Sequence, residues 1–206
     1  MKVLMVNGSP HQYGTTYTAL KEMEKIFVEE NVENEIFWIG NKAIAGCIGC
    51  GYCRKEGHCF QNDVVNDFID KVKTADGFVF ASPVHFAAAS GAMTSFMDRA
   101  FYSGRKLMRY KPAAIVVTAR RAGTSAAFEQ LLKYPTINEM PVVSSSYWNN
   151  LFGANAEDAL QDFEGLATMR NLARNMIYIL KCFEAGKEKQ VSLPASEENI
   201  KTNFIR

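Results

Sequence analysis

The stretch KVLMVN-GSPHQYGTT, residues 2–16, decides the fold. Its first six positions contain a run of four apolar residues, 3–6, which is typical of a strand buried on both faces. The next nine are rich in glycine and hydroxyl side chains, and they lead into an amphipathic helix expected over 16–30. A strand, a polar turn and a helix in this order open a strand–helix–strand unit, so the stretch predicts an α/β protein.

The same alternation continues along the chain and predicts five strands and five helices. The expected strands are 2–7, 35–39, 77–81, 113–118 and 142–147, and the expected helices are 16–30, 64–74, 90–102, 124–134 and 156–184. Ligands of an open parallel sheet bind outside the carboxyl ends of its strands. The site is therefore expected in the loops that follow them, at 8–16, 41–62, 82–90, 119–123 and 148–155.

Length and composition favour one globular domain and exclude several classes. The chain has 206 residues, 48% of them hydrophobic and 22% charged, which is ordinary for a packed core and unlike a disordered or fibrous chain. Lysine and arginine number 23 against 22 aspartate and glutamate, for a net charge of +1. The chain therefore lacks the large positive charge that attracts the phosphates of a nucleic acid, so we expect no nucleic-acid partner.

The ends of the chain lead to three further expectations. The apolar run at the start is too short for a signal peptide, and no stretch reaches the roughly 18 apolar residues that span a bilayer. We therefore expect a cytoplasmic protein with no membrane partner. The last segment lacks clear periodicity, which predicts a domain over 1–186 and an arm over 187–206 that packs on a partner subunit.

The first loop predicts an anion site. Backbone N–H groups and the hydroxyls of Ser9, Thr15 and Thr16 converge at a helix N-terminus, where phosphate groups bind. The loop lacks both the G-x-G-x-x-G spacing of a dinucleotide fold and the Gly-Lys-Ser/Thr of a triphosphate loop, which disfavours ATP, GTP and a tightly bound NAD. The alternative is that the three hydroxyl residues merely cap the helix.

Two later loops add candidate residues at the same edge of the sheet. The segment 82–91, SPVHFAAASG, is a proline–aromatic turn running through small residues into a helix, where a flat ring could lie. Prolines and aromatic residues at the end of a strand equally often only form a turn or pack in the core. The segment 119–124, ARRAGT, supplies small residues, cations and a hydroxyl, although arginines such as Arg120 and Arg121 are more often solvated than functional.

Four of the five cysteines lie within thirteen positions, as Cys47-x2-Cys50-x2-Cys53-x5-Cys59. A structural zinc site usually takes two knuckles a dozen or more residues apart, whereas one compact run resembles ferredoxin ligation and favours an iron–sulfur cluster. The last gap of five and the lack of a proline after Cys59 differ from ferredoxins. Thiols without a cluster, zinc and a disulfide remain open. The segment is C-x6-R, not the C-x5-R of a low-molecular-weight phosphatase, and Cys182 is expected to be a buried apolar residue.

Almost the whole chain resembles the flavodoxin-like NADPH-dependent FMN reductases, close to the iron–sulfur flavoproteins. The supporting pieces are the Gly-Ser-Pro and Gly-Thr-Thr of the first loop, the cysteine run, Ser-Pro-Val-x-Phe with Ser-Gly, Phe-Met-Asp-Arg, and the late strings LQDFEGL and MRNLARNM. The resemblance implies a doubly wound five-stranded parallel sheet in the order 2-1-3-4-5, with helices on both faces. The family usually has tyrosine at the position of His85 and a basic residue at that of His11.

The resemblance also implies the cofactors and their residues. The phosphate of FMN would be bound by the first loop, through Ser9, His11, Gly14, Thr15 and Thr16. Its ring would lie against Pro83, Val84, His85 and Phe86, and its other edge would be closed by Ala119, Arg120, Gly123 and Thr124. A [4Fe-4S] cluster would be ligated by Cys47, Cys50, Cys53 and Cys59. The flavin carries the chemistry, so no catalytic side chain is expected.

The implied function is electron transfer from NAD(P)H through FMN, directly or via the cluster, to a small molecule or a ferredoxin-like protein. The choice between NADPH and NADH stays open, with Arg105, Arg109, Arg120 and Arg121 as candidate cations. A homodimer or homotetramer is expected, with the cysteine loop near a subunit interface. Two rivals are a non-enzymatic FMN carrier of the flavodoxin type, which is usually strongly acidic, and a cysteine-based redox or metal sensor.

Overall fold

A five-stranded parallel sheet forms the centre of the protein in the computed structural model, which describes residues 1–195, 197, 202 and 204. The sheet order is β2-β1-β3-β5-β6, and a two-residue strand, β4, pairs antiparallel with the end of β3. The strands are β1 (Lys2–Asn7), β2 (Glu33–Trp38), β3 (Gly77–His85), β4 (Ala88–Ala89), β5 (Ala113–Ala119) and β6 (Asn150–Phe152). With the parallel strands counted in chain order, this is the predicted order 2-1-3-4-5.

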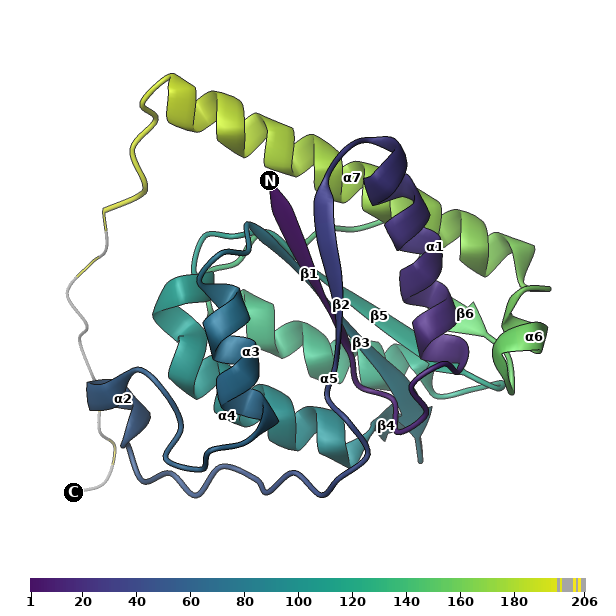
Figure 1. The fold of residues 1–206 in the computed structure, drawn as a ribbon, viewed down its shortest axis with the longest axis horizontal. Helices are drawn as coiled ribbons and strands as arrows, with labels where there is room; N and C mark the ends of the chain where they lie inside the picture. The colour runs from purple at the N-terminus through teal and green to yellow at the C-terminus, as the bar shows by residue number, and fades with distance from the viewer. Residues whose placement is uncertain (196, 198–201, 203, 205–206) are drawn as a thin grey trace.

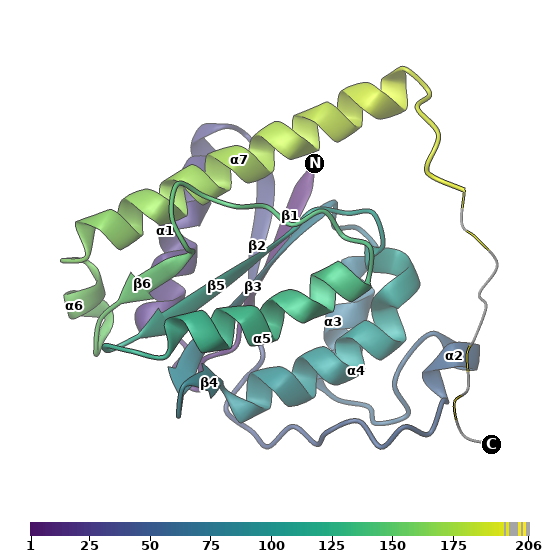
Figure 2. The ribbon, with the colours of Figure 1, turned by 180° about the vertical axis from the view of Figure 1, so that it is seen from behind.

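Helices cover both faces of the sheet (Figures 1 and 2). Two lie on one face, α1 (Thr15–Glu29) and α7 (Phe163–Glu188), and three on the other, α3 (Val64–Val72), α4 (Gly91–Met108) and α5 (Thr124–Ile137). Two short helices, α2 (Cys53–Glu56) and α6 (Ala156–Ala159), lie in connecting segments. Successive residues of β1 face opposite layers, so Leu4 packs toward α3 and α4 while Met5 packs toward α1 and α7. This arrangement confirms the predicted fold class.

The prediction of a last strand over 142–147 is wrong. Only Val142 forms a bridge to the sheet, with Ala113, and the edge strand is β6 instead. The serines that follow bond to α7: the Ser145 hydroxyl donates to the carbonyl of Thr168 at 2.7 Å, and other groups of 144–146 accept from α7 side chains. Because these polar groups find partners on the helix, the segment leaves the sheet before it rejoins at residue 150.

Several predicted helix and strand bounds also shift. The expected helix 156–184 is two helices, because the chain turns at 160–162 and the carboxylate of Asp162 caps α7 by accepting from the Gly165 amide at 2.9 Å. Both α4 and α5 continue beyond their expected ends, to Met108 and Ile137, while β3 extends four residues further, to His85. The short helix α2 was not predicted.

The predicted boundary at 186/187 falls inside α7, which ends at Glu188. Most of the last part of the predicted arm, at 196, 198–201, 203 and 205–206, lies outside the described residues. The arm and its role at a subunit interface stay predictions. Among the described residues, no helix combines the length and the apolar character needed to cross a bilayer.

Candidate functional site

A pocket of about 860 Å³ opens at the carboxyl ends of the strands, where the predicted loops meet. We call it the strand-edge pocket. Ten of the thirteen residues predicted to hold a flavin line it: Ser9, His11, Gly14, Thr15, Thr16, Pro83, Val84, His85, Ala119 and Arg120. They come from the loop after β1, the end of β3 and the end of β5. The fold therefore brings ten of the predicted residues, from three distant segments of the chain, to one pocket.

The other three predicted residues, Phe86, Gly123 and Thr124, lie outside its lining. The Phe86 side chain is fully exposed, and Thr124 is buried at the start of α5. Gly123 sits in the left-handed region, with φ of 88°, so close to the loop after β3 that an added Cβ would lie 2.7 Å from the Cα of Ala87. The two loops thus contact one another beside the pocket, and these residues do not enter it.

The first loop is held against the sheet by its own backbone and by Asn7. The Asn7 amide group donates to the Gln12 carbonyl at 3.0 Å and accepts from the Ser9 amide at 3.1 Å. The Gly8 amide donates to the Ala81 carbonyl at 2.8 Å, an approach that leaves no room for a Cβ at position 8. The loop is therefore a preformed element, fixed at both of its ends.

The N-terminus of α1 carries no side-chain cap. Its N-cap residue is Gly14, and within the described chain no side chain accepts from the first-turn amides of this helix. By contrast α3, α4 and α7 are each capped, by Asp63, Ser90 and Asp162, and α5, which also starts uncapped, begins outside the lining of the pocket. Uncapped first-turn N–H groups carry the positive end of the helix dipole, so this N-terminus, on the wall of the pocket, offers a favourable environment for an anion.

The hydroxyls of the first loop have other partners than the helix amides. The Ser9 oxygen accepts from the His11 amide at 3.1 Å, and Thr16 pairs with Thr118 at 2.8 Å between two hydroxyl oxygens. The Thr15 hydroxyl donates across the pocket to backbone carbonyls at 153 and 155. The capping alternative is thus wrong for these three residues. The hydroxyls of Ser9 and of the threonine pair each retain donor capacity.

Two residues of the strand-edge pocket, Trp38 and Thr118, were missed at the sequence level. Trp38, at the end of β2, donates from its ring nitrogen to the Ser9 carbonyl at 2.7 Å, and Thr118, the polar residue near the end of β5, forms the pair with Thr16. The segment 153–157, after β6, also lines the pocket, and its first three residues belong to the loop 148–155 in which the site was expected. For Thr118, the signal was available in the sequence, as a polar residue near the end of an otherwise apolar strand.

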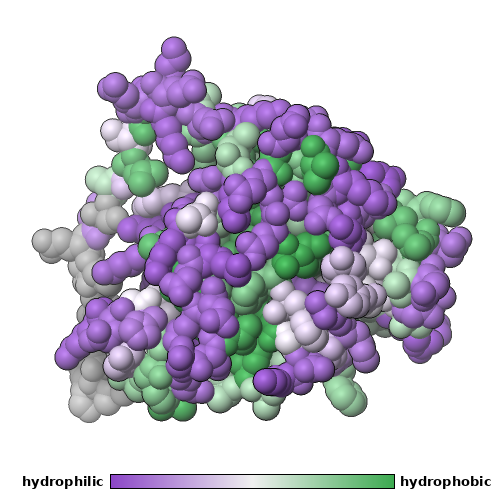
Figure 3. All heavy atoms as spheres, in the orientation of Figure 1, coloured by the Kyte–Doolittle hydropathy of each residue, from purple (hydrophilic) through white to green (hydrophobic). Residues whose placement is uncertain are grey.

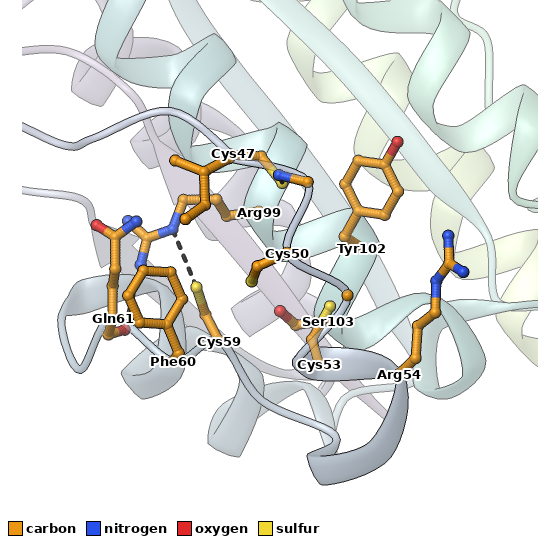
Figure 4. A pocket seen from close by; sticks show the side chains of 13 residues that line it. Cys47, Cys50, Cys53, Arg54, Cys59, Phe60, Gln61, Arg99, Tyr102 and Ser103 are labelled. Carbon is orange, nitrogen blue, oxygen red and sulfur yellow. Dashed lines mark hydrogen bonds between the residues drawn. The ribbon is translucent and has the colours of Figure 1, made fainter.

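The four clustered cysteines line a second pocket, the cysteine pocket, against α4 (Figure 4). Their side chains surround one hollow, and Gly49 and Gly51 turn the backbone around it with φ of 68° and 72°. All cysteines of the described chain are free thiols. No three histidine, cysteine or carboxylate side chains in that part of the chain lie close enough to share a single metal ion. Cys182 is exposed, so the prediction that it is buried is wrong.

The comparisons with known proteins agree with this architecture. Residues 1–153 match the NADPH-dependent FMN reductase family. An iron-sulfur flavoprotein of Methanocaldococcus jannaschii is 32% identical over 189 residues, which cover 88% of this chain and 98% of that relative. An iron-sulfur flavoprotein of Methanosarcina thermophila is 23% identical over 193 residues, or 92% of this chain and 100% of the relative.

Solved structures show the fold alone. A flavone reductase superposes with a TM-score of 0.67 at 18% identity, over 89% of this chain and 64% of the other. A WrbA-like flavodoxin from Agrobacterium tumefaciens gives a TM-score of 0.61 at 13% identity, over 88% and 96% of the two chains. This chain belongs to the NADPH-dependent FMN reductase family, which confirms the resemblance seen in the sequence. Its class is that of the flavin-dependent oxidoreductases.

Proposed function

We propose that this protein binds FMN in the strand-edge pocket and passes electrons from NAD(P)H through the flavin to an acceptor, with a [4Fe-4S] cluster on the four clustered cysteines as the second redox group. The observation that carries the proposal is the bare N-terminus of α1 on the pocket wall. An uncapped helix end with hydroxyls beside it fits the doubly charged phosphate of a flavin mononucleotide.

The residues of the pocket divide into two roles. The first-turn amides of α1, with Ser9 and the threonine pair, would hold the phosphate. The flat ring would lie against Pro83, Val84 and His85, which β4 keeps in place by pairing with both Val84 and His85. When bound, FMN supplies hydride and single-electron chemistry, so the protein's part is to orient the ring and to shield it from water.

Of the four candidate arginines for the nicotinamide cofactor, Arg120 is the one that lines the strand-edge pocket. Arg105 donates to the carbonyl of Ile137, and Arg109 pairs with Glu139, so both are engaged at the other end of α5. The proposal therefore assigns Arg120 to an anionic group of the electron donor. Its replacement should raise the KM for the nicotinamide and leave the bound flavin in place.

The cysteine pocket fits a cluster by the chemistry of its donors. Four thiols from one short segment surround one hollow, and the Nε–H of Arg99 donates to the sulfur of Cys59 at 3.3 Å. Thiolates are the usual ligands of [4Fe-4S] clusters, and a neighbouring N–H donor is a common feature of such sites. Cys47, Cys50, Cys53 and Cys59 would hold it.

A basic cleft next to the cysteine pocket supports a single-electron partner. It carries five cationic side chains and two carboxylates, so its net charge is +3 in a chain whose total is +1. These seven residues are Arg54, Lys55, Lys73, Arg105, Lys106, Glu56 and Asp70. The surface over α2 is correspondingly hydrophilic (Figure 3). Such a surface attracts an acidic electron carrier, such as a ferredoxin-like protein. Oligomeric state and cytoplasmic location remain predictions.

The decisive experiment is purification of the full chain without oxygen, followed by assay of FMN, iron and acid-labile sulfide on one sample. About four irons per chain together with FMN supports the whole proposal, and oxidation of NADPH or NADH by that sample identifies the donor. Cys50→Ser should lose the iron and keep the flavin, while Cys182→Ser, on the distant α7, should keep both. A protein without flavin would overturn the proposal.

A further inference from the structure

Arg99, in the middle of α4, is the most deeply buried charged residue of the described chain, with 1% of its surface exposed. It ends the Phe-Met-Asp-Arg string of the sequence, to which neither the flavin pocket nor the cysteine ligands give a role. A buried guanidinium is costly unless every N–H group finds an acceptor. The position of its acceptors therefore shows what the residue holds together.

All five N–H groups of Arg99 donate. Two form a bidentate pair with the carboxylate of Asp63, at 2.7 and 2.8 Å. Two more donate to the carbonyls of Ala45 and Gln61, at 3.4 and 3.2 Å. The fifth, Nε–H, donates to the sulfur of Cys59 at 3.3 Å (Figure 4).

These acceptors lie on both sides of the cysteine loop, residues 46–60. Ala45 immediately precedes it, whereas Gln61 and Asp63 follow it. Asn66 also holds the second end, by exchanging hydrogen bonds with the backbone of Cys59, but within the described residues it makes no hydrogen bond to the first end. Within the described residues, Arg99 is thus the side chain that bonds to both ends of the loop.

The charge of Arg99 is secure at this position. A guanidinium stays protonated in proteins, and the carboxylate of Asp63 pairs with it at 2.7 and 2.8 Å. Asp63 in turn caps α3 by accepting from the Val65 amide at 3.1 Å. The pair therefore joins α4, the start of α3 and the loop into one rigid unit.

We propose that Arg99 is the positioning residue of the cysteine loop: its guanidinium fastens both ends of the loop to α4 and donates to the sulfur of Cys59, so that the four thiols surround one hollow before any cluster is bound. The identity of the bound group rests on the proposed function. The fastening of the loop does not.

The test uses the full, flavin-loaded chain with Asp63→Asn, which weakens the pair while asparagine still caps α3. The matched control is Asp70→Asn, on the exposed face of the same helix. In iron-free protein, exchange of the backbone amides of 54–59 should quicken about tenfold in Asp63→Asn, as expected for loss of a charge-assisted hydrogen bond. In iron-loaded protein, a chelator should remove iron faster by a similar factor. The control should match wild type in both.

Arg99→Lys supplies a second readout, because lysine keeps the charge and loses the fork of donors. Its cluster should be harder to reduce than that of wild type, since a hydrogen bond to a ligand sulfur favours the reduced form. Flavin content reports that each variant is folded. Wild-type exchange and wild-type iron loss in Asp63→Asn would overturn the inference. If the wild-type chain takes up no iron, the cluster of the proposed function is refuted instead. The exchange comparison would still decide the role of Arg99.

Discussion

The hydroxyl pair of Thr16 and Thr118 gives a quantitative test of how the strand-edge pocket is built. The two oxygens lie 2.8 Å apart, and the residues are 1% and 2% exposed. Valine has the shape of threonine without the hydroxyl, so either single valine variant leaves one buried hydroxyl without its partner. That loss costs about 1–3 kcal/mol, whereas removing both hydroxyls is nearly neutral. The double variant should therefore be more stable than the sum of the two single effects predicts.

The assay is urea denaturation of the flavin-free full chain for wild type, Thr16→Val, Thr118→Val and the double variant. In the presence of flavin, the double variant should also bind FMN roughly 10- to 150-fold more weakly, because the phosphate loses a donor worth about 1.5–3 kcal/mol. Thr136→Val, at an exposed position of α5, should change neither quantity. Strictly additive losses would refute the shared hydrogen bond. Unchanged FMN affinity in the double variant would refute the phosphate contact.

Three further perturbations test the surroundings of the pocket. Gly8→Ala places a Cβ 2.8 Å from the carbonyl oxygen of Ala81 and should destabilise the chain by about 1–3 kcal/mol in thermal unfolding, whereas Gly46→Ala, with open space around it, should match wild type. Trp38→Phe removes the donor to the first loop and should weaken FMN binding about fivefold in fluorescence titration; equal affinities would show that the loop does not need this bond. Burial of Glu22 disfavours its charged form, but two cationic partners outweigh burial and lower its pKa. Glu22→Gln should therefore be less stable than wild type at pH 7, and this difference should disappear as the pH falls below about 4 and the wild-type carboxylate is protonated. A stability difference that does not depend on pH would contradict this.

Local patterns predicted the strands that are buried on both faces, because such strands must be apolar throughout. The runs that became β1, β3 and β5 satisfy that condition, and each was found within a few residues. The last strand was misplaced because the apolar Val142 and Val143 are followed by serines whose partners lie on α7. Only the tertiary contact decides between sheet and helix for these polar groups, and no local pattern shows it.

Sequence patterns likewise predicted one part of the candidate site and missed another. Glycine, proline and hydroxyl residues directly after strands pointed to the strand-edge pocket, since parallel strands bring their carboxyl ends to one edge. The spacing of the cysteines pointed to the cysteine pocket. The partners Thr118, Trp38 and Arg99 were not found, because each bonds to a residue that is distant in sequence. Such pairings depend on packing, which the order of residues along the chain does not display.

One helix positions both pockets. At its start, the hydroxyl of Ser90 donates to the carbonyl of Gly8 at 3.1 Å and so holds the first loop, while nine residues later Arg99 holds the cysteine loop. At a rise of 1.5 Å per residue the two anchors are about 14 Å apart along α4. Because the helix is rigid and packed on its buried face, this separation is fixed within one chain. Loss of either anchor should therefore disturb one pocket and leave the other intact, which is why flavin content is a sound control for every change made at the cysteine loop.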